Sequence, residues 1–286
     1  MFIMLMSGLV VGAVYALVAV GYNITFLSAG VLNFAFAYMV VLGSFLSWAG
    51  RDSGVPMPLL LLAGAGLGAL LGLVEERVAI RPIKNKGSHT ELITTVGFAT
   101  VVTGVILLVW GADVRKVPSL VGGSIGIGSA DIAFSEVLIL VMALALATGF
   151  GLWSRRSRLG LASLAQAEDR EAAMVLGVDV RRLSLAAFAA AGLLAVVLGF
   201  VVGPKTFAVP ESGALLAVKG FVVLALGGVG SYLGAVIAGL TIGVLESVAS
   251  YAWSSEVQGL TVFLLFIVVL AVRPQGMFGQ RAGRVV

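Results

Sequence analysis

The sequence contains no cysteine and a single histidine, His89, and it has little charge. Without cysteine the chain can form no disulfide, has no thiol nucleophile and offers no thiolate to a metal ion. A single histidine excludes a metal site built from several imidazoles. Only 11% of the 286 residues are charged, against about 25% in typical soluble domains, and no charged residue precedes Arg51. These absences exclude a water-soluble globular enzyme.

Long apolar segments take the place of charge. Hydrophobic residues make up 60% of the chain, and the mean hydropathy is +1.12. A helix that crosses a membrane needs about 20 mostly apolar residues, whereas the strands of a membrane barrel alternate polar and apolar side chains. The continuous apolar runs therefore predict an all-α polytopic integral membrane protein, with one transmembrane domain over residues 1–286.

We expect about nine membrane-spanning helices, some of them short or broken. The count ranges from about eight to about ten, depending on whether breaks at 22–30 and 227–231 are re-entrant. The expected spans are 2–21, 31–49, 58–74, 92–111, 137–153, 185–203, 214–229, 231–246 and 257–272.

The basic residues predict the orientation, because Lys and Arg gather in cytoplasmic loops. Most of the 18 Lys and Arg lie in segments 74–90 and 154–183 and in the tail from Arg273. We therefore expect a cytoplasmic C-terminus and an external N-terminus, and no nucleic-acid partner is needed to explain the net charge of +4. The longest external loop is then about 112–136, where Gly122-Gly123-Ser124 and Gly126-Ile127-Gly128 predict turns or a short hairpin.

The sequence shows no catalytic constellation. The glycine cluster 227–231 lacks the Lys-Ser/Thr that follows a phosphate-binding loop, so we interpret it as a tight turn between two packed helices. His89 lies in a basic loop and is interpreted as a solvated residue. We expect no enzymatic activity, catalytic residue, metal or cofactor in this chain. Glycines at GxxxG spacing, such as Gly8/Gly12 and Gly64/Gly68/Gly72, are interpreted as helix-packing positions.

The cytoplasmic segment 160–183 predicts a short helix. One mostly apolar stripe contains Leu161, Leu164, Ala165, Glu168, Ala172, Val175 and Leu176, with Gln166 elsewhere on the helix. Gly177 predicts the end of the helix, because glycine favours the left-handed conformation found there. The helix could lie on lipid headgroups or dock a cytoplasmic protein. The acidic side chains of Glu168, Asp169 and Glu171 would be repelled by anionic lipid, which favours the docking interpretation.

Polar groups at membrane depth are costly and are therefore candidates for function. Lys219 and Glu246 are interpreted either as an ion pair or snorkelled anchor, or as groups that contact solute or a docked protein. Asn33, which precedes Phe34, either lines a pathway or forms an interhelical hydrogen bond.

The segment 169–177, DREAAMVLG, resembles the cytoplasmic Glu-Ala-Ala…Gly loop of ABC importer permeases, and more specifically of those of the branched-chain amino acid type. The chain departs from that family at Phe36, Ala37 and Tyr38, where His-Gly and an acidic residue are common, and this leaves the cargo open. Other similar motifs follow in order over roughly residues 8–279: Gly8-Leu9, Tyr15-Ala16-Leu17, Leu32-Asn33-Phe34-Ala35, Glu76-Arg77, Arg81-Pro82, Leu226-Gly227-Gly228-Val229-Gly230-Ser231 and Arg273-Pro274-Gln275-Gly276-Met277-Phe278-Gly279.

This resemblance implies a multi-subunit importer in the bacterial inner membrane. Two separate ATPase subunits would bind ATP and Mg²⁺, an external binding protein would deliver the solute, and a second permease, usually a paralogue, would complete the pathway. The residues expected to couple ATP hydrolysis to transport are Glu168, Asp169, Arg170, Glu171, Ala172, Ala173 and Gly177. Those expected to contact the pathway or the binding protein are Asn33, Phe34, Lys219 and Glu246.

The alternative is an ion-coupled secondary transporter. Its site would lie at helices broken at 22–30 and 227–231, with Glu246 as the ion carrier. The sequence does not identify the solute under either hypothesis.

Overall fold

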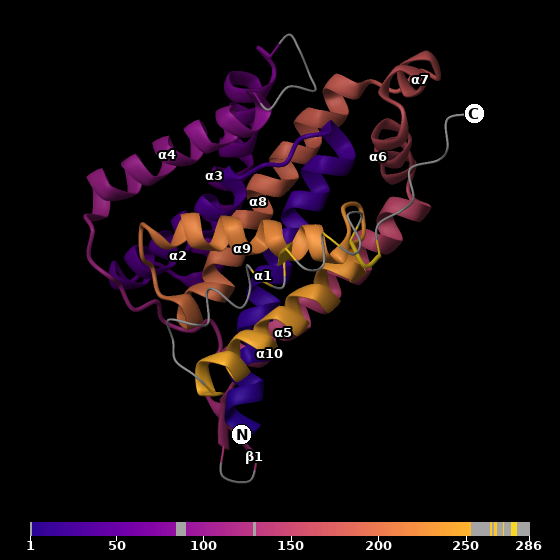
Figure 1. Cartoon of the computed structure of the whole chain (residues 1–286). Coiled ribbons are helices and arrows are strands. Elements are labelled where there is room, and N and C mark those ends of the chain that lie inside the picture. Colours follow the sequence, from indigo (N-terminus) through magenta and orange to yellow (C-terminus); the bar gives the residue numbers. More distant parts are fainter. Residues whose placement is uncertain are drawn as a thin grey trace. The chain divides into compact units, whose positions relative to one another are not determined.

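The computed structural model describes residues 2–83, 90–127, 130–252, 264, 266–267, 271 and 276–278. This part of the chain is helical apart from its connections and one hairpin (Figure 1). The elements are α1 (Phe2–Ala29), α2 (Ala35–Asp52), α3 (Met57–Glu75), the π-helical turn η1 (Glu76–Ile80), α4 (Thr90–Trp110), β1 (Ser124–Ile127), β2 (Ala130–Ala133), α5 (Phe134–Arg156), α6 (Arg158–Glu168), α7 (Arg170–Val175), α8 (Val180–Thr206), α9 (Ser212–Gly227) and α10 (Tyr232–Ala252).

Within the described residues, six helices are long and apolar enough to cross a membrane. They are α1, α3 with η1, α4, α5, α8 and α10; α9 is a shorter apolar helix. The predicted all-α polytopic class is thus supported. The count of about nine spans stays a prediction, because most of the expected span 257–272 lies outside the described residues, as do His89 and most of the tail from Arg273.

The helix α1 corrects the predicted break at 22–30. It continues to Ala29, and the chain turns only at Gly30, whose φ is +76°. The polar residues of this segment, Asn23, Thr25 and Ser28, are buried inside the protein. Because protein groups satisfy buried polar side chains, these residues do not interrupt the helix.

Two other predicted connections are confirmed. The chain breaks between α9 and α10, where Gly228 and Gly230 have φ of 91° and 87°. The loop 112–136 contains the antiparallel hairpin β1–β2, with Ser124 opposite Ala133 and Ile127 opposite Ala130.

The chain forms two compact units. The first unit comprises residues 1–23, 122–153 and 218–286, and the second comprises residues 24–121 and 154–217. In the second unit α8 packs against both α2 and α3 (Figure 1). Its core includes Leu42 and Phe45 of α2 and Ile106 of α4.

Glycines at GxxxG spacing let helix backbones touch, as predicted. In the second unit Gly68 of α3 faces Gly192 of α8 so closely that a methyl group on either would overlap the other's carbonyl oxygen. In the first unit Gly12 of α1 meets Gly239 of α10 in the same way. These close contacts fix the helices side by side without long side chains.

Candidate functional site

The segment predicted as one cytoplasmic helix consists of two, α6 and α7. Asp169 lies between them in an extended conformation, with φ of −149°. Its Oδ1 accepts hydrogen bonds from the backbone N–H groups of Glu171 and Ala172, at 2.9 and 3.0 Å. The prediction of a single helix is wrong because this aspartate caps a new helix, and a capping residue is non-helical.

Gly177 ends α7 as predicted. Its φ is +87°, and its N–H donates to the carbonyl of Met174 while that of Val178 donates to the carbonyl of Ala173, both at 3.0 Å. This paired arrangement is the Schellman motif, which needs a left-handed residue at this position. The end of α7 is therefore fixed by its own backbone.

The break at Asp169 also overturns the predicted apolar stripe. Gln166, predicted to lie off the stripe, is buried, whereas Val175 and Leu176, predicted to be on it, are 88% and 81% exposed. Met174 is 48% exposed. We call residues Met174, Val175 and Leu176 the apolar tip.

The predicted coupling residues lie next to this tip in the sequence. Glu168, Asp169, Glu171, Ala172 and Gly177 are exposed, Arg170 is partly exposed, and Ala173 is buried. The structure therefore places charged groups on the surface beside the apolar tip; their coupling role stays a prediction.

In the first unit, Lys219 and Glu246 form a buried ion pair. Lys219 Nζ lies 2.6 Å from Glu246 Oε1 and donates to Tyr15 Oη at 2.9 Å. Tyr15 in turn donates to Glu246 Oε2 at 3.0 Å. The result is a closed ring of three side chains from α1, α9 and α10. We interpret it as the ion pair that was one of the two alternatives; contact with solute or a docked protein stays a prediction.

Tyr15 was not predicted as a partner of these charges. Its signal in the sequence is a phenol within a long apolar run, because a buried tyrosine hydroxyl normally needs a hydrogen-bond partner.

In the second unit, Asn33 forms a buried hydrogen bond to the end of α3. Its Nδ2 donates to Glu75 Oε2 at 2.8 Å, and both side chains are buried. Phe34 is partly buried and precedes the first residue of α2. The structure thus gives Asn33 the interhelical bond that was one of its two alternatives. The carboxyl groups of Glu75 and Glu76 are both buried; Glu76 was quoted above only as part of the Glu76-Arg77 motif, and Glu75 was not singled out from the sequence.

The glycine turn between α9 and α10 is held by two other segments of the first unit. Asn23 Oδ1 accepts from the N–H of Gly230 at 2.7 Å, and its Nδ2 donates to the carbonyl of Ser231 at 3.3 Å. The N–H groups of Met277 and Phe278 donate to Leu226 and Gly227. The described residues 276–278 of one motif quoted above therefore meet the motif 226–231, and the turn has a packing role as predicted.

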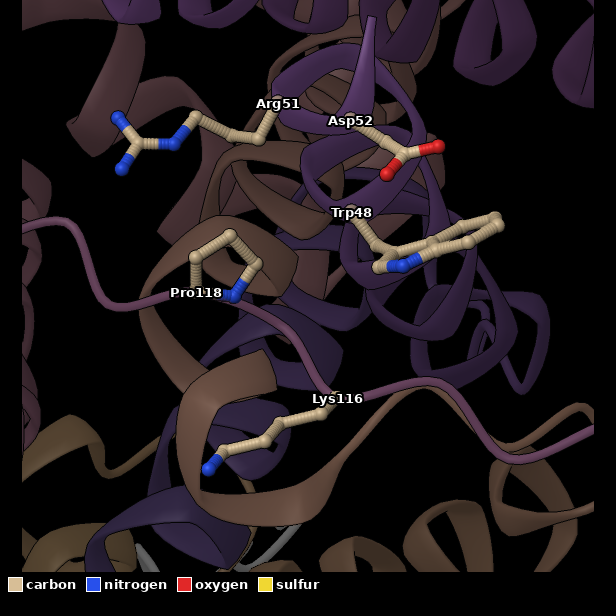
Figure 2. Close-up of a pocket in the computed structure, with 5 residues that line it drawn as sticks. All are labelled: Trp48, Arg51, Asp52, Lys116 and Pro118. Atoms are coloured by element: carbon tan, nitrogen blue, oxygen red, sulfur yellow. The ribbon is translucent and has the colours of Figure 1, made fainter.

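A shallow pocket of about 420 Å³ lies at the C-terminal end of α2 (Figure 2). It is lined by Trp48, Arg51, Asp52, Lys116 and Pro118. In Figure 2, Trp48 and Asp52 project to one side of α2 and Arg51 to the other. The sequence signal for this pocket is the presence of basic residues on the expected external side, against the usual pattern.

Arg115 fixes the segment that carries Lys116. Its guanidinium lies 4.7 Å from the ring centre of Trp48 and 3.0 Å from the carboxylate of Asp113. Its backbone pairs with that of Ala208, just after α8. The pocket is therefore tied to the C-terminal end of α8.

The pocket and the apolar tip lie at opposite ends of the second unit. The helix α8 begins at Val180, soon after the tip, and ends at Thr206, beside the pair formed by Ala208 and Arg115. Its 27 residues correspond to about 40 Å at 1.5 Å per residue. This length exceeds the hydrocarbon core of a membrane, which is about 30 Å thick.

Comparisons with known proteins agree with the motifs. The high-affinity branched-chain amino acid transport system permease protein BraD of Pseudomonas aeruginosa is 30% identical over 294 residues, which cover 96% of this chain and 95% of BraD. The corresponding protein LivH of Salmonella typhimurium is 32% identical over 289 residues, which cover 96% of this chain and 94% of LivH. A probable LivH of Methanocaldococcus jannaschii is 26% identical over 287 residues, which cover 92% of this chain and 88% of that protein.

A solved structure supports the fold. PsaBC from Streptococcus pneumoniae in complex with Fab superposes with a TM-score of 0.52 at 11% identity, covering 98% of this chain and 93% of that one. Residues 4–272 match the family described as "Branched-chain amino acid transport system / permease component". The chain therefore belongs to the permease components of branched-chain amino acid transport systems, and it is a membrane transport subunit rather than an enzyme.

Proposed function

We propose that this chain is a permease subunit of a binding-protein-dependent ABC importer in the bacterial inner membrane. It forms part of the pathway for a branched-chain amino acid or a related small polar or amphipathic solute. Two separate ATPase subunits bind ATP and Mg²⁺, and a second permease, a paralogue, completes the pathway. The C-terminus is cytoplasmic and the N-terminus external.

The exposed apolar tip is the observation that carries the ATPase part of this proposal. Val175 and Leu176 are almost fully exposed, and apolar side chains held in water mark a surface that a partner covers. The hydrocarbon core of the membrane is not that partner, because the neighbouring Glu168, Asp169 and Glu171 would carry their charges into it.

The local backbone suits a docking element. The aspartate cap at one end of α7 and the Schellman turn at the other fix the tip before any partner binds, which reduces the entropy lost on docking. The charges of Glu168, Arg170 and Glu171 lie in the same segment as the tip, and charges at a docking surface favour one partner and orientation over others. The small, buried Ala173 allows α7 to lie close to its neighbours.

The opposite end of the second unit suits the external partner. Arg51 and Lys116 line the pocket with only Asp52 as a counter-charge, and Arg115 is already engaged by Asp113. An acidic side chain of the solute-binding protein would find two cations there. Complementary charge of this kind speeds association and sets orientation.

The test of the ATPase part is capture of the ATPase subunits from native membranes in mild detergent. The double variant Val175→Asp/Leu176→Asp places charge on the tip without touching the core, so we expect its capture of ATPase subunits to fall at least about tenfold. Val114→Asp is the matched control, because Val114 is also exposed, at 63%, but belongs to the pocket end.

Two results would contradict the proposal. Normal capture and ATP-driven uptake by the double variant would show that the tip docks nothing. Purification of the unaltered chain as a stable protein without any ATPase would favour the ion-coupled secondary transporter, and uptake driven by an ion gradient alone would then be expected.

A further inference from the structure

A buried hydrogen bond joins the docking segment to the end of α1 within the second unit. Ser28 Oγ lies 3.0 Å from Ser163 Oγ of α6, and the two residues are 4% and 1% exposed. Ser163 also donates to the carbonyl of Leu159 at 3.0 Å. Either hydroxyl can be the donor between the two serines, because a hydroxyl both donates and accepts. This contact is directional and shielded from water.

The residues that follow Ser28 contact α3, η1 and α8. Ala29 and Val31 pack with Ile80 of η1 and Phe188 of α8 in one buried cluster. Asn33 then donates to Glu75 at the end of α3. We call residues 28–33 the connector. It contacts α6 at one end and the last turn of α3 at the other.

We infer that the connector transmits movement of the docking segment to α3, with Ser28–Ser163 as the input joint and Asn33–Glu75 as the output joint. This inference rests on the proposed function, because it assumes that ATPase subunits move α7. The connector is short, and both joints are buried hydrogen bonds. Breaking either would leave polar atoms buried without a partner, which is costly, so displacement of α6 carries α1 and α3 with it.

The connector is a second route beside the covalent one. The helix α7 continues through Gly177 and Asp179 into α8, so α8 receives movement through the chain itself. The helix α3 is far from α7 in sequence and has no such link. It packs along α8 through close backbone contacts at glycines; the connector adds a hydrogen-bonded link from α6 to the end of α3.

The absence of cysteine from the sequence allows a direct test. The double variant Ser28→Cys/Ser163→Cys contains only the two introduced thiols, and the 3.0 Å between the native oxygens places them close to the distance of a disulfide. Thiols are weak hydrogen-bond donors, so we expect the reduced form to move about fivefold less solute per ATP hydrolysed. Oxidation to the disulfide restores the joint, and the ratio returns to that of the unaltered protein.

Single variants and the output joint serve as controls. Ser28→Cys and Ser163→Cys alone lose the same hydrogen bond but form no internal disulfide, so oxidation leaves their ratio low. Asn33→Leu, of similar size but without the donor, lowers the ratio by a similar factor whatever the redox state. All variants should still capture ATPase subunits, which separates loss of coupling from loss of assembly or folding.

Two results would overturn the inference. A disulfide that arrests uptake would mean that α1 and α6 slide past each other during transport. A ratio unchanged in both redox states would mean that the contact transmits nothing. Failure of the unaltered chain to capture ATPase subunits would instead overturn the proposed function, and it is seen before any variant is compared.

Discussion

At the scale of single residues, the ring formed by Tyr15, Lys219 and Glu246 explains how two charges are tolerated at membrane depth. Each charged group has its opposite charge and the tyrosine hydroxyl within hydrogen-bonding distance. A buried charge that loses its partner is far less stable than a buried pair. The ring therefore balances charge among α1, α9 and α10.

This balance predicts that removing one charge is worse than removing both. Lys219→Met leaves the Glu246 carboxylate without the ammonium group that balances its charge, and should destabilise the protein by about 3–5 kcal/mol. The double variant Lys219→Met/Glu246→Gln removes both charges and should recover most of that loss. The measurement is thermal unfolding of the purified chain in detergent. Equal loss in the single and double variants would contradict charge balance and favour a role specific to the lysine.

The sequence alone predicts part of this ring. Lys219 and Glu246 stand out because charges are rare in apolar runs, and an ion pair between them follows from the cost of leaving either alone. Tyr15 is 204 residues from Lys219, and no local pattern joins them. The same holds for Asn33, whose partner Glu75 is 42 residues away.

At the scale of elements, the structure separates what local sequence determines from what packing determines. The end of α7 at Gly177 and the break between α9 and α10 were predictable, because glycine is needed wherever the backbone turns left-handed. The continuity of α1 was not predictable from local sequence, because residues far along the chain bury Asn23 and Ser28. Asp169 lay within a helical pattern, and its preference for the capping position outweighed that pattern.

The cap at Asp169 gives a prediction for α7. Asn is an equally good capping residue and Ala a poor one, so Asp169→Ala should destabilise α7 by about 1 kcal/mol while Asp169→Asn leaves it intact. If the tip must be pre-formed to dock, the alanine variant binds ATPase subunits about fivefold more weakly. Titration of the purified partners measures this. Equal weakening by Asn would show that the charge of Asp169 matters rather than its capping.

At the scale of the whole molecule, the second unit relates two surfaces that the sequence treats separately. The apolar tip precedes α8 and the basic pocket is tied to its other end, so a membrane-spanning α8 separates them by the thickness of a bilayer. The same placement agrees with the expected cytoplasmic position of the basic segment 154–183. The order of basic segments along the chain predicts the orientation, and packing shows that the pocket residues gather at one end of the second unit.

This arrangement predicts the accessibility of two introduced thiols. Ser53 lies exposed just after α2 at the pocket end, and Ala172 is exposed on α7. In spheroplasts, whose inner membrane is intact, a membrane-impermeant maleimide should label Ser53→Cys. Ala172→Cys should react only after the inner membrane is permeabilised. The cysteine-free parent chain gives the background.

Each departure from this pattern has a distinct meaning. Labelling of Ala172→Cys alone in cells with an intact inner membrane would mean the opposite orientation. The ATPase docking surface would then lie outside, where no ATP is available, which would contradict the proposed importer. Labelling of both variants in intact cells would contradict their separation by the membrane and remove α8 as a spanning helix. Labelling of Ser53→Cys alone places the basic pocket where a solute-binding protein can reach it, since an acidic partner can use Arg51 and Lys116 only from the external side.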